Sequence, residues 1–114
     1  MTPTPNPDFD LVLRQQVLAA LSRRWQRRLA FEGNVRAGTV VYIDGERQIR
    51  FWHEMGGGDC KLYINLPAEA QWAAATGTPL SERDEIVRFV AERVQQEKAS
   101  GWRYEISAAA IEFY

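Results

Sequence analysis

A glycine-rich stretch at residues 56–59 separates two segments of alternating apolar and polar side chains, and this arrangement constrains the fold more than any other feature. Alternation with a period of two is typical of β-strands with one buried face, and a short glycine-rich connection favours a hairpin. A four-residue loop makes Met55 face Cys60 and gathers the apolar side chains on one face. The further pairs predicted on this basis are His53 with Leu62, Phe51 with Ile64, Ile49 with Leu66, Glu54 with Lys61 and Trp52 with Tyr63.

Another hairpin is predicted directly before this one. The dipeptide Asp44-Gly45 lies between two strand-like segments, residues 39–43 and 47–53, and is a strong turn signal. The two hairpins share their middle segment, so together they predict a three-stranded antiparallel meander. Two registers remain open for the earlier hairpin: a two-residue turn opposes Val40 to Ile49, and a three-residue loop with a bulge opposes Val41 to Ile49.

The N-terminal part of the chain predicts a long amphipathic helix. Asp8 or Asp10 is its expected cap, and the helix is expected to continue to about Leu29 or Phe31. Acidic residues near its start and arginines near its end both suit the helix dipole. The apolar face expected to pack on the core consists of Leu11, Leu18, Leu21, Trp25 and Leu29.

The C-terminal part predicts two more helices and one or two short strands. Residues 67–75 are rich in alanine and precede Gly77, and a longer helix is expected to begin near Thr78 or Ser81 and to end at Gly101. Alternation over residues 102–106 and the apolar pair Ile111 and Phe113 predict strands. The order helix, three strands, short helix, helix, then one or two strands predicts a single α+β domain over residues 8–114, preceded by a flexible proline-rich arm at residues 1–7.

The composition excludes several classes of protein. The chain of 114 residues has a formal net charge of −1, so a strongly basic nucleic-acid domain is not expected. A single cysteine, Cys60, permits no intrachain disulfide, and one cysteine with one histidine cannot form a four-ligand zinc site. No segment is apolar enough to span a membrane, and we expect no secretory signal. We therefore expect a cytoplasmic protein without cofactor or metal, and twelve arginines against two lysines suggest a bacterial source.

His53 and Cys60 are the weak candidates for catalysis. They lie near one end of the predicted hairpin, where a histidine could lower the pKa of a thiol nucleophile. The predicted pairing argues against this role, because His53 opposes Leu62 and alternates with Phe51 on the apolar face. We therefore expect a partly buried histidine and a non-catalytic protein.

Two groups of residues are candidates for binding a partner. Trp52, Tyr63 and Arg50 are predicted on the sheet face opposite Phe51, and aromatic residues with arginine are typical of protein interfaces. The second group is the run of arginines at the end of the predicted first helix, which could grip phosphates or bridge to the acidic start of the later helix. Its members are Arg23, Arg24, Arg27 and Arg28.

Three functions follow from these features, in order of preference. The first is a small interaction or regulatory module that self-associates or binds a protein. The second is a small-molecule-binding protein or enzyme with a pocket between sheet and helices near His53 and Cys60. Nucleic-acid binding through the arginine-rich segment is the least favoured.

Overall fold

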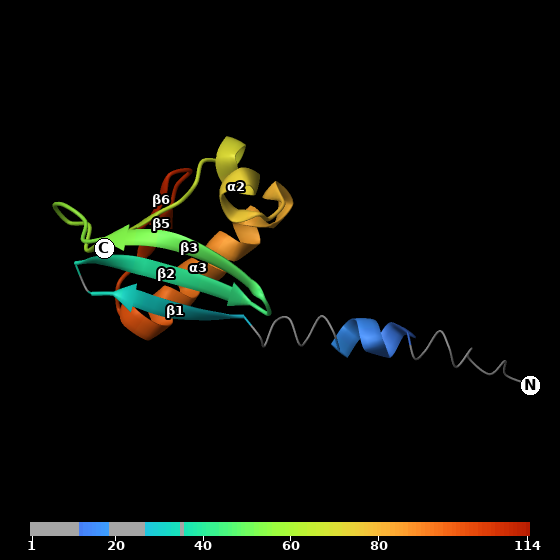
Figure 1. The fold of residues 1–114 in the computed structure, drawn as a ribbon. Coiled ribbons are helices and arrows are strands. Elements are labelled where there is room, and N and C mark those ends of the chain that lie inside the picture. The colour runs from blue at the N-terminus through green and yellow to red at the C-terminus, as the bar shows by residue number, and fades with distance from the viewer. Residues whose placement is uncertain (1–11, 19–26, 35) are drawn as a thin grey trace, which may run out of the picture.

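The computed structural model describes residues 12–18, 27–34 and 36–114, and it confirms the α+β class with an antiparallel sheet (Figure 1). Six strands form one sheet in the order β1-β2-β3-β4-β6-β5, with every neighbouring pair antiparallel. The elements are β1 (Arg28–Gly33), β2 (Ala37–Asp44), β3 (Arg47–Glu54), β4 (Leu62–Asn65), α2 (Glu69–Thr76), a 3-10 turn (Leu80–Glu82), α3 (Arg83–Lys98), β5 (Tyr104–Ile106) and β6 (Ala110–Phe113).

The N-terminal helix does not reach the end that the sequence predicts. Residues 12–18 are helical, but residues 28–33 form strand β1, so a helix reaching Leu29 or Phe31 is wrong. The spacing of apolar residues in a short run such as Leu29-Ala30-Phe31 fits a helix and a strand equally well. The segment at residues 28–33 is a strand because six of its residues pair with β2. Leu18, expected on the core face, is 62% exposed, while Leu11, Leu21 and Trp25 lie outside the described residues.

The hairpin between β2 and β3 adopts neither of the predicted registers. Tyr42 opposes Ile49, and Asp44 opposes Arg47 across a two-residue loop that begins at Gly45. Gly45 has a φ of 62°, which a glycine at the first loop position adopts without strain. The turn is therefore displaced by one residue from the Asp44-Gly45 dipeptide.

The register predicted between β3 and β4 is wrong by two residues. His53 opposes Ile64 rather than Leu62, and Glu54 opposes Tyr63 rather than Lys61. The chain around the loop pairs with other strands instead, since the Met55 amide donates to the Arg36 carbonyl and the Lys61 amide to the Phe113 carbonyl. A shift of two residues keeps each side chain on its predicted face.

The C-terminal half forms the predicted elements. Helix α2 ends at Gly77, whose φ of 66° is the left-handed conformation typical of a helix C-terminus. Helix α3 contributes a buried stripe to the core, and β5 and β6 are the two expected short strands. The buried residues of α3 are Arg83, Ile86, Val87, Val90, Ala91 and Val94.

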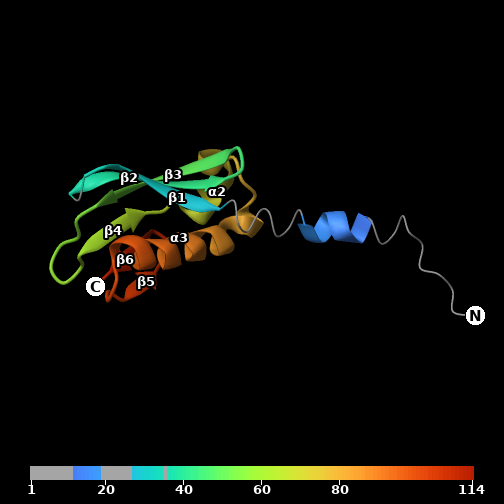
Figure 2. The same ribbon diagram turned by 90° about the horizontal axis from the view of Figure 1, so that it is seen from below.

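The domain has two layers, with α3 on one face of the sheet (Figures 1 and 2). The core lies between them and includes Tyr42, Phe51, Ile64 and Phe113 from the strands and Trp72 from α2. We call the opposite side of strands β1–β3 the outer face. No helix of the described part of the chain lies over it in Figure 1, and none of the described helices is long and apolar enough to cross a membrane.

Candidate functional site

A pocket of about 300 Å³ opens between the inner face of the sheet and the C-terminal part of α3. Its walls come from elements far apart in the sequence: the end of β1, the middle of β2, the end of β3, the start of β4, the last turns of α3 and the segment that follows α3. Most of its lining is apolar. The apolar side chains that line it are Phe31, Val40, Leu62, Val94 and Trp102.

Two opposed glycines allow β1 and β2 to approach closely beside the pocket. Gly33 pairs with Gly38, and a Cβ added at Gly33 would lie 2.6 Å from the Gly38 Cα atom. A Cβ added at Gly38 would overlap the Glu32 carbonyl oxygen and would lie 3.0 Å from Nε2 of His53. Gly38 therefore leaves the space in which the imidazole ring lies.

His53 lines the pocket and is 8% exposed. Its Nδ1 atom is buried and has no hydrogen-bond partner among the described residues. Burial lowers the pKa of this imidazole below its usual value of 6.5, because desolvation disfavours the charged form. His53 is therefore neutral at pH 7, and one ring nitrogen is left without a partner.

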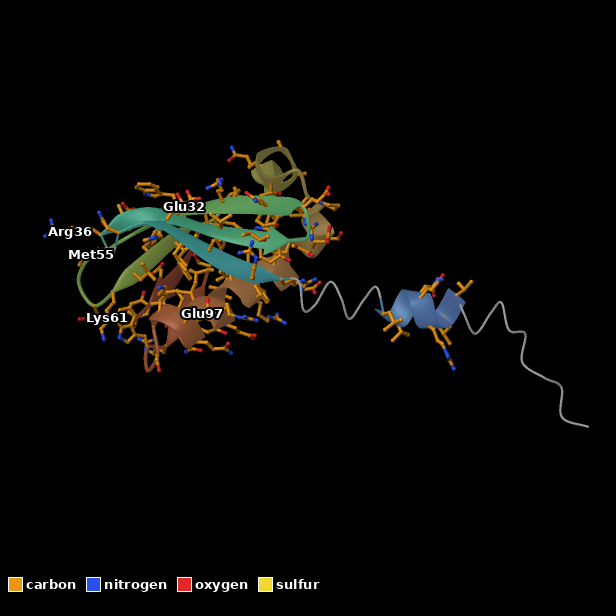
Figure 3. All side chains as sticks on the ribbon, turned by 60° about the horizontal axis from the view of Figure 1, so that its bottom comes forward. Glu32, Arg36, Met55, Lys61 and Glu97 are labelled. Atoms are coloured by element: carbon orange, nitrogen blue, oxygen red, sulfur yellow. The ribbon has the colours of Figure 1, made fainter. Side chains whose placement is uncertain are left out.

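The polar rim of the pocket includes two lysines. The Lys61 ammonium lies 5.2 Å from the centre of the Trp102 ring, and the Lys98 ammonium lies 4.9 Å from the centre of the Phe31 ring. Both distances are within the range of cation–π attraction. In Figure 3, Lys61 lies at the same end of the domain as Arg36 and Met55.

The structure does not combine Cys60 with His53 in one site. Cys60 is half-buried, and its thiol is 3.4 Å from the Leu62 carbonyl oxygen as a hydrogen-bond donor. It is absent from the pocket lining, whereas His53 is part of it. In the part of the chain that the structure describes, no three His, Cys, Asp or Glu side chains lie close enough to hold a metal ion.

The predicted partner-binding residues of the sheet lie on the outer face. Trp52 is 52% exposed, Tyr63 is half-buried, and Arg50 donates to a carboxylate oxygen of Glu32 over 2.7 Å. The corrected register places Tyr63 opposite Glu54, so Trp52 and Tyr63 are diagonal neighbours. They are not the directly opposed pair that was predicted.

The arginine-rich segment does not form one charged patch in the described residues. Arg27 bonds to Glu85 at the start of α3 over 2.7 Å, which confirms the predicted bridge to that helix, and its Nε lies 3.7 Å from Asp44. Arg28 is exposed at the beginning of β1. Arg23 and Arg24 lie outside the described residues.

Sequence reasoning identified His53 near a pocket but missed Phe31, Lys61 and Lys98 as lining residues. Phe31 was assigned to a helix, and the two lysines are brought together only by the packing of α3 on the sheet. The scarcity of lysine in an arginine-rich chain was the one available signal. Comparisons with protein-family models, curated proteins and solved structures found no match.

Proposed function

We propose that this protein binds a small, largely apolar molecule in the pocket between the sheet and α3. The observation that carries the proposal is the pocket volume of about 300 Å³ beside a buried histidine. Protein interiors are close-packed and rarely leave voids much larger than a water molecule. Ligand pockets usually hold about 300–1,000 Å³ and combine an apolar lining with a few polar groups.

The unpartnered Nδ1 of His53 supports the same proposal. Most buried polar atoms in proteins have a hydrogen-bond partner, and leaving one without a partner costs about 1–3 kcal/mol. A neutral imidazole has one donor and one acceptor nitrogen. A ligand with a polar atom near the ring would supply the missing hydrogen-bond partner. The pocket would therefore bind it in preference to ligands that lack such an atom.

We propose binding without catalysis. Cys60 does not line the pocket, and Glu32, the acid among the described lining residues, is paired with Arg50. His53 therefore has neither a nucleophile nor a carboxylate beside it as a catalytic partner in the described lining. The free thiol of Cys60 fits a reducing compartment, and we propose a cytoplasmic location.

Calorimetric titration with 2-naphthamide, a neutral bicyclic probe, tests the proposal. We expect saturable binding to the full chain. Leu62→Trp adds bulk inside the pocket and should weaken binding at least about tenfold, the equivalent of 1.4 kcal/mol. Tyr63→Trp is the matched control, because it places the same side chain on the opposite face of β4. Equal binding by both variants would overturn the proposal, and so would an absence of wild-type binding both to this probe and to the corresponding acid, 2-naphthoate.

A second candidate function is self-association through the outer face, and the 52% exposure of Trp52 favours it. Large aromatic side chains on an uncovered face are typical of interfaces. Light scattering should then show a dimer that becomes a monomer in Trp52→Ser. A monomeric mass for the wild type at every accessible concentration would exclude this function.

A further inference from the structure

Both lysines of the chain line the pocket. The sequence has two lysines and twelve arginines. Lys61 directly precedes β4, whereas Lys98 is the last residue of α3. Among the described lining residues there is no arginine. The positive charge at the pocket is therefore supplied by lysine alone, in a chain that uses arginine elsewhere.

The two ammonium groups come from different elements. Lys61 directly precedes β4 and lies over Trp102, and Lys98 is the last residue of α3 and lies over Phe31. Since both rings line the pocket, both charges lie at its rim. Both side chains are exposed, so an anion can reach them from solvent.

These lysines are available to a ligand. Within residues 12–18, 27–34 and 36–114, neither lysine forms an ion pair, and each contacts an aromatic ring instead. The Glu32 carboxylate is paired with Arg50 on the outer face, and Glu97 is exposed next to Lys98 in the sequence of α3 (Figure 3). A lysine ammonium is a compact charge that binds carboxylate without the fixed geometry that a guanidinium imposes.

We infer that the ligand is an organic carboxylate whose compact apolar body fills the pocket and whose carboxylate lies at the rim, between Lys61 and Lys98. This inference rests on the proposed function, because it names the class of molecule for the same pocket. The aromatic walls contributed by Phe31 and Trp102 favour a ring as the apolar body. The neutral His53 leaves the inner part of the pocket without a positive charge, so the anionic group belongs at the rim.

The matched probes 2-naphthoate and 2-naphthamide, which differ in charge but hardly in shape, test this inference on the full chain. Naphthoate should bind at least about tenfold more tightly than naphthamide at low salt. Lys61→Gln and Lys98→Gln should each weaken naphthoate binding about threefold to tenfold, as expected for partly exposed charge pairs, and should weaken naphthamide binding less than naphthoate binding. Arg88→Gln is the control, because it removes the same charge from an exposed site on α3 outside the pocket lining.

The outcomes separate the inference from the proposed function. Equal affinity for the two probes, or a loss of naphthoate affinity in Arg88→Gln as large as in the lysine variants, would overturn the carboxylate inference while the pocket remains a binding site. Failure of both probes to bind would overturn the proposed function and the inference together. A preference for naphthoate that decreases with added salt and is lost only in the lysine variants is the expected result.

Discussion

The ammonium of Lys98 lies 4.9 Å from the centre of the Phe31 ring, so the last turn of α3 and the edge strand β1 meet at the rim of the pocket. Phe31 faces inward from β1 beside Val40 of β2. The pocket is therefore bounded by an edge strand on one side and a helix end on the other. Its shape depends on how closely β1 and β2 approach, which the two opposed glycines determine.

Gly38→Ala tests the close approach beside His53. The added Cβ would overlap the Glu32 carbonyl oxygen and would lie 3.0 Å from Nε2 of His53, so the paired backbone of β1 would have to shift. We expect a loss of about 1–3 kcal/mol in the free energy of unfolding, measured with urea. Gly57→Ala is the matched control, since nothing lies within 4 Å of a Cβ there. Equal stabilities for the two variants would contradict this account.

The buried His53 predicts a pH-dependent stability. Burial lowers its pKa in the folded protein, so the unfolded chain binds the proton more readily. The free energy of unfolding should have its full value above pH 6.5, the usual pKa of histidine in an unfolded chain. It should decrease as the pH falls from there to the lowered pKa of His53 in the folded protein. His53 is the chain's single histidine, so His53→Leu should remove this dependence between about pH 7.5 and pH 5.5. An unchanged pH profile in the variant would show that other groups are responsible.

We expect the replacement of Arg83, a single charged residue, to lower the free energy of unfolding by a large amount. Arg83 is 5% exposed, donates to the carbonyl oxygens of Pro67 and Ala108 over 3.2 and 2.8 Å, and lies over the Trp72 ring. Arg83→Met removes both charged hydrogen bonds that tie α3 to two loops. We expect the midpoint of urea unfolding to fall by an amount equivalent to about 2–4 kcal/mol. The exposed Arg88→Met should change stability by less than about 0.5 kcal/mol.

The ion pairs of Asp44 should matter more than those at the surface. The Asp44 side chain is 7% exposed and lies 2.8 Å from Arg47 and 3.7 Å from Arg27, whereas the pair of Arg103 with Glu105 is about two-thirds exposed. Asp44→Ala leaves two guanidinium groups without this acceptor, and we expect thermal unfolding to show a loss of about 1–3 kcal/mol. Glu105→Ala should cost less than about 1 kcal/mol. A similar cost for both would mean that burial does not strengthen the Asp44 pairs.

Patterns of alternation predicted the faces of the strands but not their partners. Phe51, His53 and Ile64 lie on the predicted inner face although the β3–β4 register is shifted by two residues, because a two-residue shift preserves the faces. The register itself depends on Met55 and Lys61 pairing with segments outside the hairpin. Local spacing carries no information about such partners.

The pocket was less predictable than the sheet. His53 was placed on the inner face by alternation alone, but the other lining residues include Val94 and Lys98 from α3 and Phe31 from a segment that was assigned to a helix. Which residues surround a cavity depends on how separate elements pack. A single sequence shows which face of each helix or strand is apolar, but it does not show which other element packs on that face.

Amide chemical-shift mapping of the full ¹⁵N-labelled chain, titrated with 2-naphthoate, shows where on the protein this ligand binds. We expect saturable shifts that are largest at residues 31–34, at Lys61 and Leu62, and at the Trp102 indole, all of which line the pocket. The outer face around Trp52 serves as an internal control and should change little. Shifts that concentrate on the outer face, or the absence of any saturable shift, would contradict the claim that this pocket is a binding site.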